Sequence, residues 1–248
     1  MPLLAAALGL SLLGSGGGLL VASSLLLFTD SVRSRLVPWL VSYAVGALLG
    51  VSLLLLLPEA LESLSPSVVF ATLLVGILVF FMLEKQVLLR HCHTDECHVH
   101  ASTVPLVIIG DAFHNFIDGA TICTALMSSV PLGVNTAIAV AAHEIPQEVG
   151  DFSILLAAGY SRRRALVLNV ISGASGIVGA LVAYGTVSVL PGIRPFVLTF
   201  SSASLLYIAM SDLIPDLHRG QLDRGGWRQV LLICAGIGTV LLFEQLTQ

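Results

Sequence analysis

Seven ionisable side chains occur in two otherwise apolar, helix-length segments, 104–127 and 131–159, of this 248-residue chain. They are Asp111, His114 and Asp118 in the first segment and His143, Glu144, Glu148 and Asp151 in the second. Within each segment many of them are three or four residues apart, the spacing that places side chains on one stripe of a helix. Imidazoles and carboxylates suit a divalent transition metal, so the pattern indicates metal binding.

Two amide side chains extend this donor set, Asn115 beside His114 and Gln147 four residues after His143. At about 1.5 Å of helix rise per residue, both histidines fall near the middle of their segments, so the two helices offer polar groups at the same depth. Nitrogen and oxygen donors favour Zn²⁺ or Fe²⁺ over an alkali ion, and Cu(I) is disfavoured because Cys123 lies off the polar stripe. The candidate metal ligands are His114, Asn115, Asp118, His143, Glu144 and Gln147. Candidates for a secondary site or an ion pathway are Asp111, Glu148 and Asp151.

The composition indicates that lipid surrounds most of the chain. Hydrophobic residues make up 56% and charged residues 10%, with a mean hydropathy of +0.97, whereas a soluble domain has roughly 25% charged residues. An ionisable side chain at the bilayer centre costs about 2.5–3.5 kcal/mol. Seven such groups are therefore expected to face a water-filled cavity or a bound ion. The alternative is that they pair with one another and hold the helices together.

Apolar segments long enough to span a bilayer, about 20 residues each, alternate with polar breaks. Eight such segments are predicted, at residues 3–28, 36–58, 66–89, 103–127, 131–159, 164–190, 194–215 and 227–247. Ten of the eleven Lys and Arg residues fall on alternate connections, and only Arg194 falls on the other side. The positive-inside rule places those connections in the cytoplasm and both termini outside. The predicted fold class is an all-α integral membrane protein with eight transmembrane helices and extracytoplasmic termini.

A short internal similarity indicates a repeat. The stretch LLLLLPEALESL (53–64) ends the second predicted segment, and AMSDLIPDLHRG (209–220) ends the seventh. The predicted topology places them at opposite faces of the membrane, as in the inverted repeats of many transporters. This pattern favours an inverted repeat of helices 1–3 against helices 6–8, with a chance match as the alternative.

Two motifs in the polar segments resemble the signature of the ZIP family of divalent metal transporters. They are HNFIDG (114–119) and HEIPQEVGDF (143–152), and the second is similar to HEIPHELGDF, the fifth-helix sequence of one subfamily. The stretches LLPEAL in the second segment, GILVFFMLEK (76–85) and FSSASLLYIAMSDLIPDL (200–217) also agree with the family. The resemblance covers essentially the whole chain. It implies a single transporter domain, residues 1–248, with a 3+2+3 arrangement of helices and an elevator-like movement of helices 1, 4, 5 and 6.

The family carries a binuclear metal site between helices 4 and 5. The resemblance implies one metal position at His114, Asp118, His143 and Gln147 and another at Asn115, Asp118, Glu144 and Gln147. This sequence departs from the family at three points: Gln147 replaces a histidine or glutamate, Ile117 replaces a proline, and helix 6 offers Asn169 where some members have glutamate. Because an amide binds more weakly than these groups, we expect one well-formed site.

The loop RHCHTDECHVH (90–100), between the third and fourth segments, holds four histidines and two cysteines. Their spacing is not that of a zinc finger, but their density favours metal binding. The family often carries a His-rich loop here, thought to collect or sense the emerging ion. We expect residues 90–102 to form a cytoplasmic loop that modulates transport, with a bland solvated loop as the alternative. Its candidate ligands are His91, Cys92, His93, Cys97, His98 and His100.

The expected function is import of a divalent transition metal into the cytoplasm, with Zn²⁺ as the first choice of substrate and Fe²⁺, Mn²⁺ or Cd²⁺ as others. We expect a multi-pass protein of the bacterial inner (plasma) membrane, in contact with the lipid bilayer, without an organic cofactor or a nucleic-acid partner. A homodimer is one assembly that the sequence allows. An intramembrane zinc metalloprotease is an alternative function, because HEIPQ nearly matches H-E-x-x-H. A metal sensor that does not transport is another.

Overall fold

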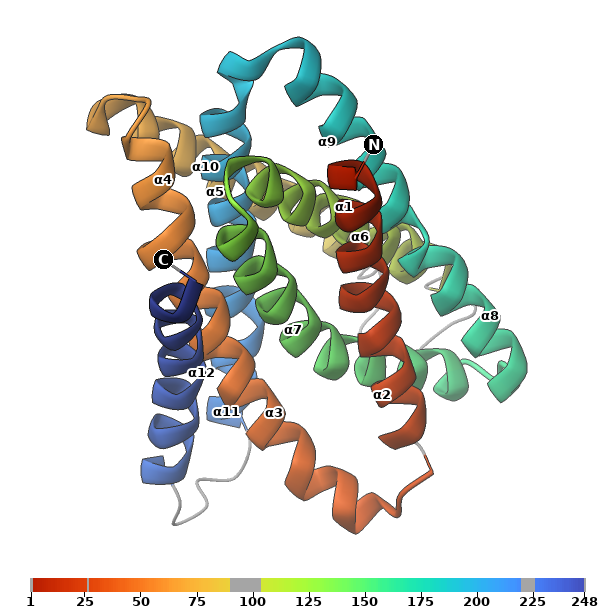
Figure 1. Ribbon diagram of the computed structural model, residues 1–248. Helices are drawn as coiled ribbons and strands as arrows, with labels where there is room; N and C mark the ends of the chain where they lie inside the picture. Colours follow the sequence, from red (N-terminus) through yellow and green to blue (C-terminus); the bar gives the residue numbers. More distant parts are fainter. Residues whose placement is uncertain (1, 26, 90–103, 220–225, 248) are drawn as a thin grey trace.

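The computed structural model describes residues 2–25, 27–89, 104–219 and 226–247, and these ranges are helical throughout apart from short turns (Figure 1). The first half contains α1 (Pro2–Ser11), η1 (Leu12–Gly16), α2 (Gly17–Leu25), α3 (Asp30–Gly50), η2 (Val51–Leu56), α4 (Leu57–Leu61) and α5 (Pro66–Leu89). The second half contains α6 (Val104–Ser128), α7 (Val130–Ala157), α8 (Arg162–Gly173), α9 (Ser175–Val189), η3 (Pro191–Ile193), α10 (Arg194–Tyr207), η4 (Ile208–Leu213), α11 (Ile214–Arg219) and α12 (Gly226–Thr247). Consecutive elements join into rods that follow the predicted segments.

Six of these rods are long and apolar enough to cross a membrane, among the described residues. They are Pro2–Leu25, Ser34–Leu61, Pro66–Lys85, Arg162–Val189, Pro191–His218 and Gly226–Leu246. The polar helices α6 and α7, with 25 and 28 residues, are also long enough, but their ionisable side chains lower their hydropathy. The structure therefore shows an all-helical protein with six apolar candidate spans, and the crossing of α6 and α7 stays a prediction.

One predicted boundary differs from the structure. The sequence places a break at residues 29–35, because charged residues interrupt the apolar pattern there, but α3 already begins at Asp30. Charged residues of this kind do not end a helix, since long basic side chains reach the membrane surface from a helical backbone. Hydropathy therefore predicted the apolar part of this helix, from residue 36 onward, and did not predict the helical residues 30–35 before it.

Local sequence signals position the two polar helices. Ser129 caps α7, because its hydroxyl accepts a hydrogen bond from the Leu132 amide at 3.2 Å. At the other end of α7, Gly159 has a φ of +85°. The Tyr160 amide then donates to the Leu155 carbonyl at 3.1 Å, which closes the helix with a left-handed glycine. With only Ser129 between α6 and α7, the two helices form an antiparallel hairpin.

The π-helical segments η2 and η4 have the same local geometry. Leu57, which precedes Pro58, donates its amide to the Ser52 carbonyl, and Ile214, which precedes Pro215, donates to Ala209. Each bond spans five residues and sits next to a proline, which has no amide hydrogen of its own to donate. The two similar stretches thus share a backbone feature as well as residues, while their relation as an inverted repeat stays a prediction.

The helices pack as two groups that meet along α7. In the first group, α6 contacts α1, α7, α8 and α9 and α2 contacts α7; in the second, α3 contacts α12 and α5 contacts α10. Glycines bring the backbones together inside each group: a β-carbon on Gly179 would overlap the Phe116 carbonyl, and one on Gly236 would overlap the Tyr43 carbonyl. Between the groups, α3 meets α7 and α10 meets α6, and apolar side chains such as Leu48 and Leu132 pack together there.

We predict that Gly179→Ala destabilises the protein, because the added methyl group needs space that the Phe116 carbonyl occupies. Overpacking of this kind costs about 1–3 kcal/mol. Gly185→Ala is the matched control in the same helix, since no atom lies within 4 Å of its β-carbon position. Thermal unfolding in detergent should show a lower Tm for the first variant and an unchanged or higher Tm for the second. Equal Tm values would contradict the close contact of α6 with α9.

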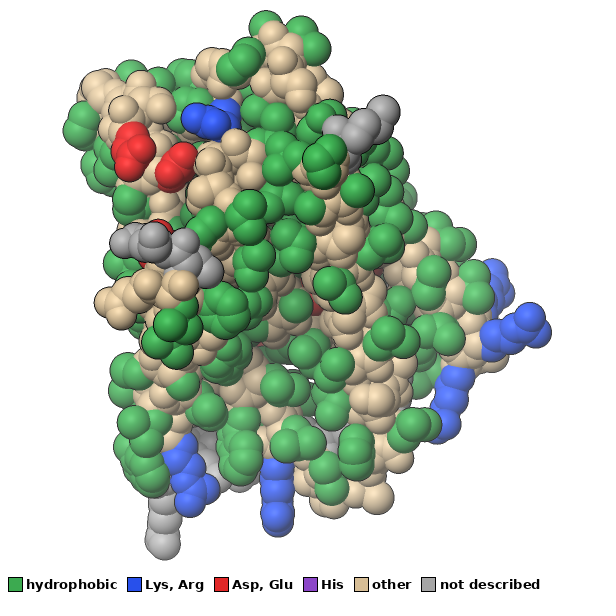
Figure 2. Space-filling view, in the orientation of Figure 1, with side chains coloured by type: hydrophobic (Ala, Val, Ile, Leu, Met, Phe, Trp, Pro, Cys, Tyr) green, Lys and Arg blue, Asp and Glu red, His purple; other side chains and the backbone are tan. Residues whose placement is uncertain are grey.

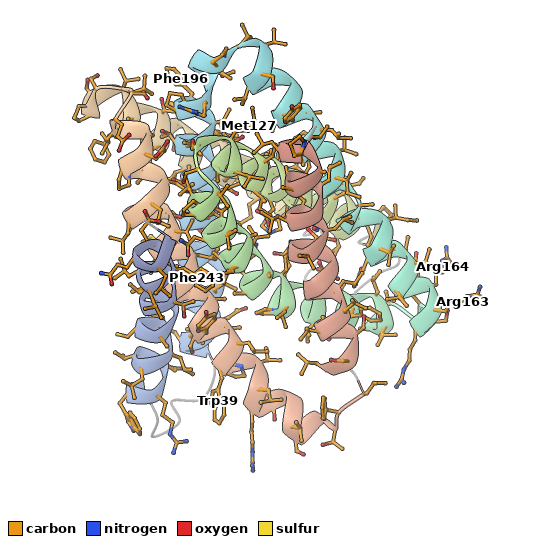
Figure 3. The ribbon with its side chains drawn as sticks, in the orientation of Figure 1. Trp39, Met127, Arg163, Arg164, Phe196 and Phe243 are labelled. Atoms are coloured by element: carbon orange, nitrogen blue, oxygen red, sulfur yellow. The ribbon has the colours of Figure 1, made fainter. Side chains whose placement is uncertain are left out.

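Charged side chains mark the two ends of the bundle. In Figure 3, Arg163 and Arg164 lie at the end where α8 begins, while Met127 and Phe196 lie at the opposite end. Arg194 belongs to the latter end, because its guanidinium donates to the Met127 carbonyl at 3.3 Å. Most Lys and Arg side chains visible in Figure 2 lie along the lower edge and lower right, and hydrophobic side chains cover the surface between the ends.

Candidate metal centre

The hairpin of α6 and α7 brings imidazole and carboxylate groups together inside the bundle. Near the middle of these helices, His114, Asp118, His143 and Glu144 place one ligand atom each within 4.8 Å of one another. Asp118, His143 and Glu144 are fully buried, and the His114 side chain is 14% exposed. Among the described residues this is the one group of three or more His, Cys, Asp or Glu with such spacing.

The distances between these atoms suit one small cation. Nε2 of His143 lies 3.0 Å from Nε2 of His114 and 3.1 Å from Oδ2 of Asp118. His114 Nε2 lies 3.4 Å from the same Asp118 oxygen and 3.9 Å from Oε1 of Glu144. Ligands about 2.1 Å from a tetrahedral Zn²⁺ are separated by about 3.4 Å. Short inward movements would therefore bring all four atoms to a single ion.

A backbone contact orients His143 for metal binding. Its Nδ1 lies 3.1 Å from the carbonyl oxygen of Ala139, one turn earlier in α7. If Nδ1 carries the proton and donates it to that carbonyl, the lone pair of the neutral ring lies on Nε2, the atom in the cluster. The helix itself thus fixes which ring nitrogen can act as a ligand.

The carboxylates of the cluster are not neutralised by protein donors. Both oxygens of Asp118 and both oxygens of Glu144 are buried without a hydrogen bond, although imidazole nitrogens lie close by. Buried charges of this kind are strongly unfavourable unless they are paired or coordinate a metal. A divalent cation between the two helices would bind one oxygen of each carboxylate, whereas direct pairing of the groups leaves all four oxygens without aligned donors. The geometry therefore favours a cation site over structural glue.

Asp111 positions the two amide side chains. Its Oδ1 accepts hydrogen bonds from the Asn115 amide at 2.9 Å and from the Gln147 amide at 3.2 Å. Because the NH₂ groups face Asp111, the carbonyl oxygens are the atoms that remain for a cation, and Oδ1 of Asn115 is buried without a partner. The structure groups Glu144 with both histidines, while Gln147 is held by Asp111. The division into two metal positions that the family resemblance implies stays a prediction.

Two further features of the centre were not apparent from the sequence. Gly18 of α2 lies against α7 so closely that a β-carbon there would be 2.7 Å from Cβ of Glu144, so α2 closes one side of the centre. Asn169 of α8 is fully buried, and neither of its polar side-chain atoms has a hydrogen bond. In the sequence Asn169 stands where some family members have glutamate, and only the fold places it and Gly18 near α7.

The remaining candidate residues fall into two groups. Glu148 and Asp151 follow the centre along α7, with Glu148 fully buried and Asp151 half-buried. Cys123 is buried in a separate apolar cluster with Leu126 and Ala180, away from the centre. The loop residues His91, Cys92, His93, Cys97, His98 and His100 lie outside the described residues, so their role as ligands stays a prediction.

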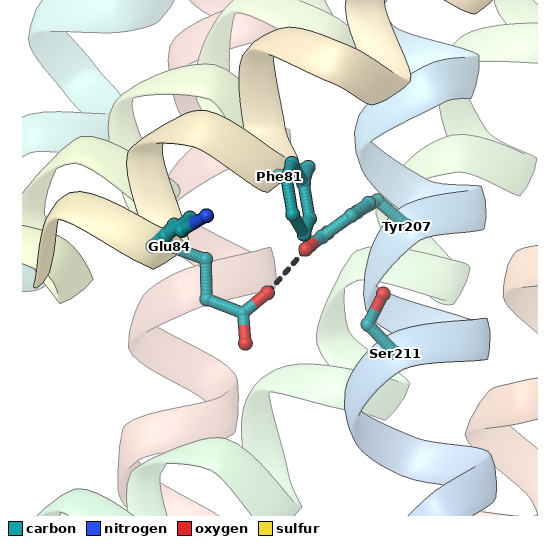
Figure 4. Close-up of a pocket in the computed structure, with 5 residues that line it drawn as sticks. Phe81, Glu84, Tyr207 and Ser211 are labelled. Carbon is teal, nitrogen blue, oxygen red and sulfur yellow. Dashed lines mark hydrogen bonds between the residues drawn. The ribbon is translucent and has the colours of Figure 1, made fainter. Parts of the chain in front are cut away.

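A separate pocket lies between α5 and the junction of α10 with η4 (Figure 4). Phe81, Glu84, Lys85, Tyr207 and Ser211 line it, and the Tyr207 hydroxyl donates a hydrogen bond to the Glu84 carboxylate. None of these residues belongs to the metal cluster. The hydrogen bond joins two helices of the second group, and its contribution is structural.

We predict that Tyr207→Phe lowers the free energy of unfolding by about 0.6–1.7 kcal/mol, the range for hydrogen bonds between membrane helices. The variant removes the donor to Glu84 and retains the ring that packs 6.4 Å from Phe80. Tyr184→Phe is the control, because no hydrogen bond of that hydroxyl occurs among the described residues. Unfolding in denaturant should give a lower free energy of unfolding for Tyr207→Phe than for Tyr184→Phe. Equal free energies of unfolding for the two variants would exclude a stabilising role for this bond.

Imidazole and carboxylate groups clustered between buried helices of an apolar bundle are typical of a membrane protein that handles a metal ion. The family profile described as "ZIP Zinc transporter" matches residues 89–244. Zinc transporter ZIP13 of Pongo abelii is 35% identical over 235 residues, which cover 86% of this chain and 70% of ZIP13. The chain belongs to the ZIP family.

Other relatives are much longer than the part they share with this chain. Zinc transporter ZIP4 of Mus musculus is 38% identical over 144 residues, which cover 57% of this chain and 22% of ZIP4. An uncharacterized zinc transporter of Schizosaccharomyces pombe, P8A3.03, is 36% identical over 152 residues, 56% of this chain and 33% of that protein. The shared part in these relatives is therefore less than half of their length.

Proposed function

We propose that this protein carries Zn²⁺ across a membrane and into the cytoplasm, with the cluster of His114, Asp118, His143 and Glu144 as the binding site within the bilayer. The observation that supports this most is the buried cluster itself, with two imidazoles and two carboxylates within 4.8 Å and no hydrogen bond to any of the carboxylate oxygens. The family and the names of its zinc-transporting relatives agree with this substrate. Fe²⁺, Mn²⁺ and Cd²⁺ are further candidates, because the same donors accept them.

The proposed orientation in the membrane rests on the charge distribution. The end of the bundle with Arg163 and Arg164 is the cytoplasmic end under the positive-inside rule, and the end with Arg194 is the outer end. This orientation, together with α6 and α7 as transmembrane helices, makes eight spans with both termini outside. The ion enters from the outer end, binds to the cluster and leaves toward the loop at residues 90–102.

The movement that exposes the site first to one side of the membrane and then to the other is elevator-like. Glycine contacts join α6 to α9 through backbone atoms, so α1, α2 and α6–α9 can move as one rigid group. A cluster of apolar side chains spans the contact of this group with α3 and α10. Apolar contacts of that type can shift without breaking many hydrogen bonds. One hydrogen bond that such a movement would break is the bond between the groups from the Thr121 hydroxyl to the Ser201 hydroxyl.

A metalloprotease is the weaker candidate. That chemistry needs a second histidine four residues after His143 as a zinc ligand, with the glutamate as general base. Gln147 occupies the position instead, and its amide nitrogen is bound to Asp111. A sensor that binds metal without moving it differs from a transporter only in ion flux.

Uptake into proteoliposomes tests the function directly. The purified chain is reconstituted around a trapped zinc-sensitive fluorophore, and Zn²⁺ is added outside. We expect a saturable signal that Cd²⁺, Fe²⁺ and Mn²⁺ reduce in proportion to their affinity. Binding of Zn²⁺ without flux would identify a sensor, and cleavage of a membrane substrate without flux would identify a protease.

A further inference from the structure

A second group of polar residues lies beyond the metal centre, toward the end of the bundle where α7 meets α8. Glu148 lies four residues after Glu144 on α7, about 6 Å further along the helix, and Asp151 lies three residues beyond it. The antiparallel neighbours α6 and α8 contribute Asp111 and Asn169. These residues therefore lie between the metal centre and the end that carries Arg163 and Arg164 (Figure 1).

Most polar atoms of this group have no protein partner. Glu148 and Asn169 are both fully buried, and none of their four side-chain oxygen and nitrogen atoms has a hydrogen bond. Oδ2 of Asp111 and Oδ2 of Asp151 are likewise buried without a donor. Native structures leave few buried polar groups unsatisfied, so this concentration indicates that something outside the chain contacts them.

The charges of the group act on one another. The carboxylates of Asp111, Glu148 and Asp151 are near enough to interact electrostatically, and the Asn169 amide lies beside Glu148 without the alignment of a hydrogen bond. Among the described residues, no Lys or Arg is one of the groups that act on Glu148 or Asp151. Three carboxylates in this position repel one another, and a cation between them would remove that repulsion.

The donor set defines the kind of cation. All its ligands are carboxylate or amide oxygens, which suit divalent ions that keep water in their coordination shell. The carboxylate oxygens are also further apart than direct ligands of one ion, because the 4.8 Å spacing among described residues occurs in the histidine cluster alone. Water molecules must therefore fill part of the coordination shell.

We propose that Asp111, Glu148, Asp151 and Asn169 form a second site, which binds a divalent cation together with part of its water shell. Its role as a relay rests on the proposed transport: the ion passes from the histidine cluster to this site before it leaves. Oxygen ligands hold Zn²⁺ less tightly than ligand sets that include imidazole, and water in the shell weakens the hold further. The second site thus favours release toward the cytoplasmic end.

Binding of Mn²⁺ followed by electron paramagnetic resonance tests the second site. Mn²⁺ binds to oxygen ligands, and pulsed spectra distinguish an ion bound to imidazole nitrogen from one bound to water and carboxylates. The chain is used with the His and Cys residues of the loop at 90–102 replaced by serine. We expect two Mn²⁺ ions per chain, one with nitrogen coupling and one with exchangeable water. In His114→Ala/His143→Ala, the ion without nitrogen coupling should remain.

The decisive variants are Glu148→Gln and Glu148→Gln/Asp151→Asn. We expect the single change to weaken the nitrogen-free ion by about tenfold or more and the double change to abolish it, while the ion at the histidine cluster remains. Both changes remove buried charge and keep side-chain size, and thermal unfolding verifies the fold. Glu62→Gln, at an exposed position, is the control. A starting protein that binds only the nitrogen-coupled ion, or a nitrogen-free ion unaffected by both variants, would overturn the proposal. A starting protein that binds only the nitrogen-free ion would instead count against the proposed function.

Discussion

Zinc uptake should fall to the level of protein-free liposomes when His143 is replaced by alanine or Asp118 by asparagine. Each residue supplies a ligand atom within 3.1–3.4 Å of its neighbours in the cluster. Loss of a partner that only supports a metal ligand costs about 10- to 100-fold in affinity, and loss of the ligand itself should cost at least as much. Initial uptake rates over a range of Zn²⁺ concentrations measure the effect.

The two variants should remain folded, so that the loss of uptake reports on the site. Asp118→Asn removes a buried charge whose oxygens make no hydrogen bond, at nearly constant volume, and we expect its Tm to be equal to or higher than that of the starting protein. His218→Ala is the control for the histidine change, because His218 is exposed at the end of α11. Full uptake in both His143→Ala and Asp118→Asn would exclude this cluster as the transport site.

A disulfide between α6 and α10 should stop transport reversibly. The hydroxyls of Thr121 and Ser201 lie 2.8 Å apart and join the two helix groups, so cysteines at these positions are close enough to be linked. If the group with α6 moves against α10, oxidation of Thr121→Cys/Ser201→Cys locks it in place. Uptake should fall by at least tenfold after oxidation and return after reduction.

The matched control links two helices of the same group. A β-carbon at Gly173 of α8 would lie 3.9 Å from Cβ of Ser15 in η1, so Ser15→Cys/Gly173→Cys places a bond inside the moving group. Both pairs are made in a chain without the four native cysteines. We expect the linked control to transport normally. Equal uptake before and after formation of the Thr121–Ser201 bond would contradict the elevator-like movement.

The sequence predicted the helices and the candidate ligands because both depend on local patterns. Apolar runs predicted the long helical segments, and spacings of three or four residues placed His114 with Asp118 on one face of a helix. The motif of α7 supplied His143 and Glu144. The antiparallel hairpin then needed only the short connection at Ser129, which the sequence also shows. These features of the site could therefore be predicted before the fold was known.

Contacts between distant segments could not be predicted in the same way. Hydrogen bonds from Asn115 and Gln147 to Asp111 depend on side-chain orientation, so residue types alone predicted both amides as ligands without their common acceptor. Asn169 is one polar residue in an apolar helix, and its position beside Glu148 follows from the packing of α8 on α7. The approach of Gly18 to Glu144 likewise depends on how α2 packs, which periodicity does not define.

Diffraction from crystals containing Zn²⁺, measured on both sides of the zinc absorption edge, is the most direct test of the metal centre. We predict one strong anomalous peak between α6 and α7, about 2.0–2.2 Å from ligand atoms of His114, Asp118, His143 and Glu144. The same peak should disappear in His143→Ala. A strong zinc peak elsewhere in the chain with none between α6 and α7, or a map in which the four side chains contact only one another, would contradict the proposed site.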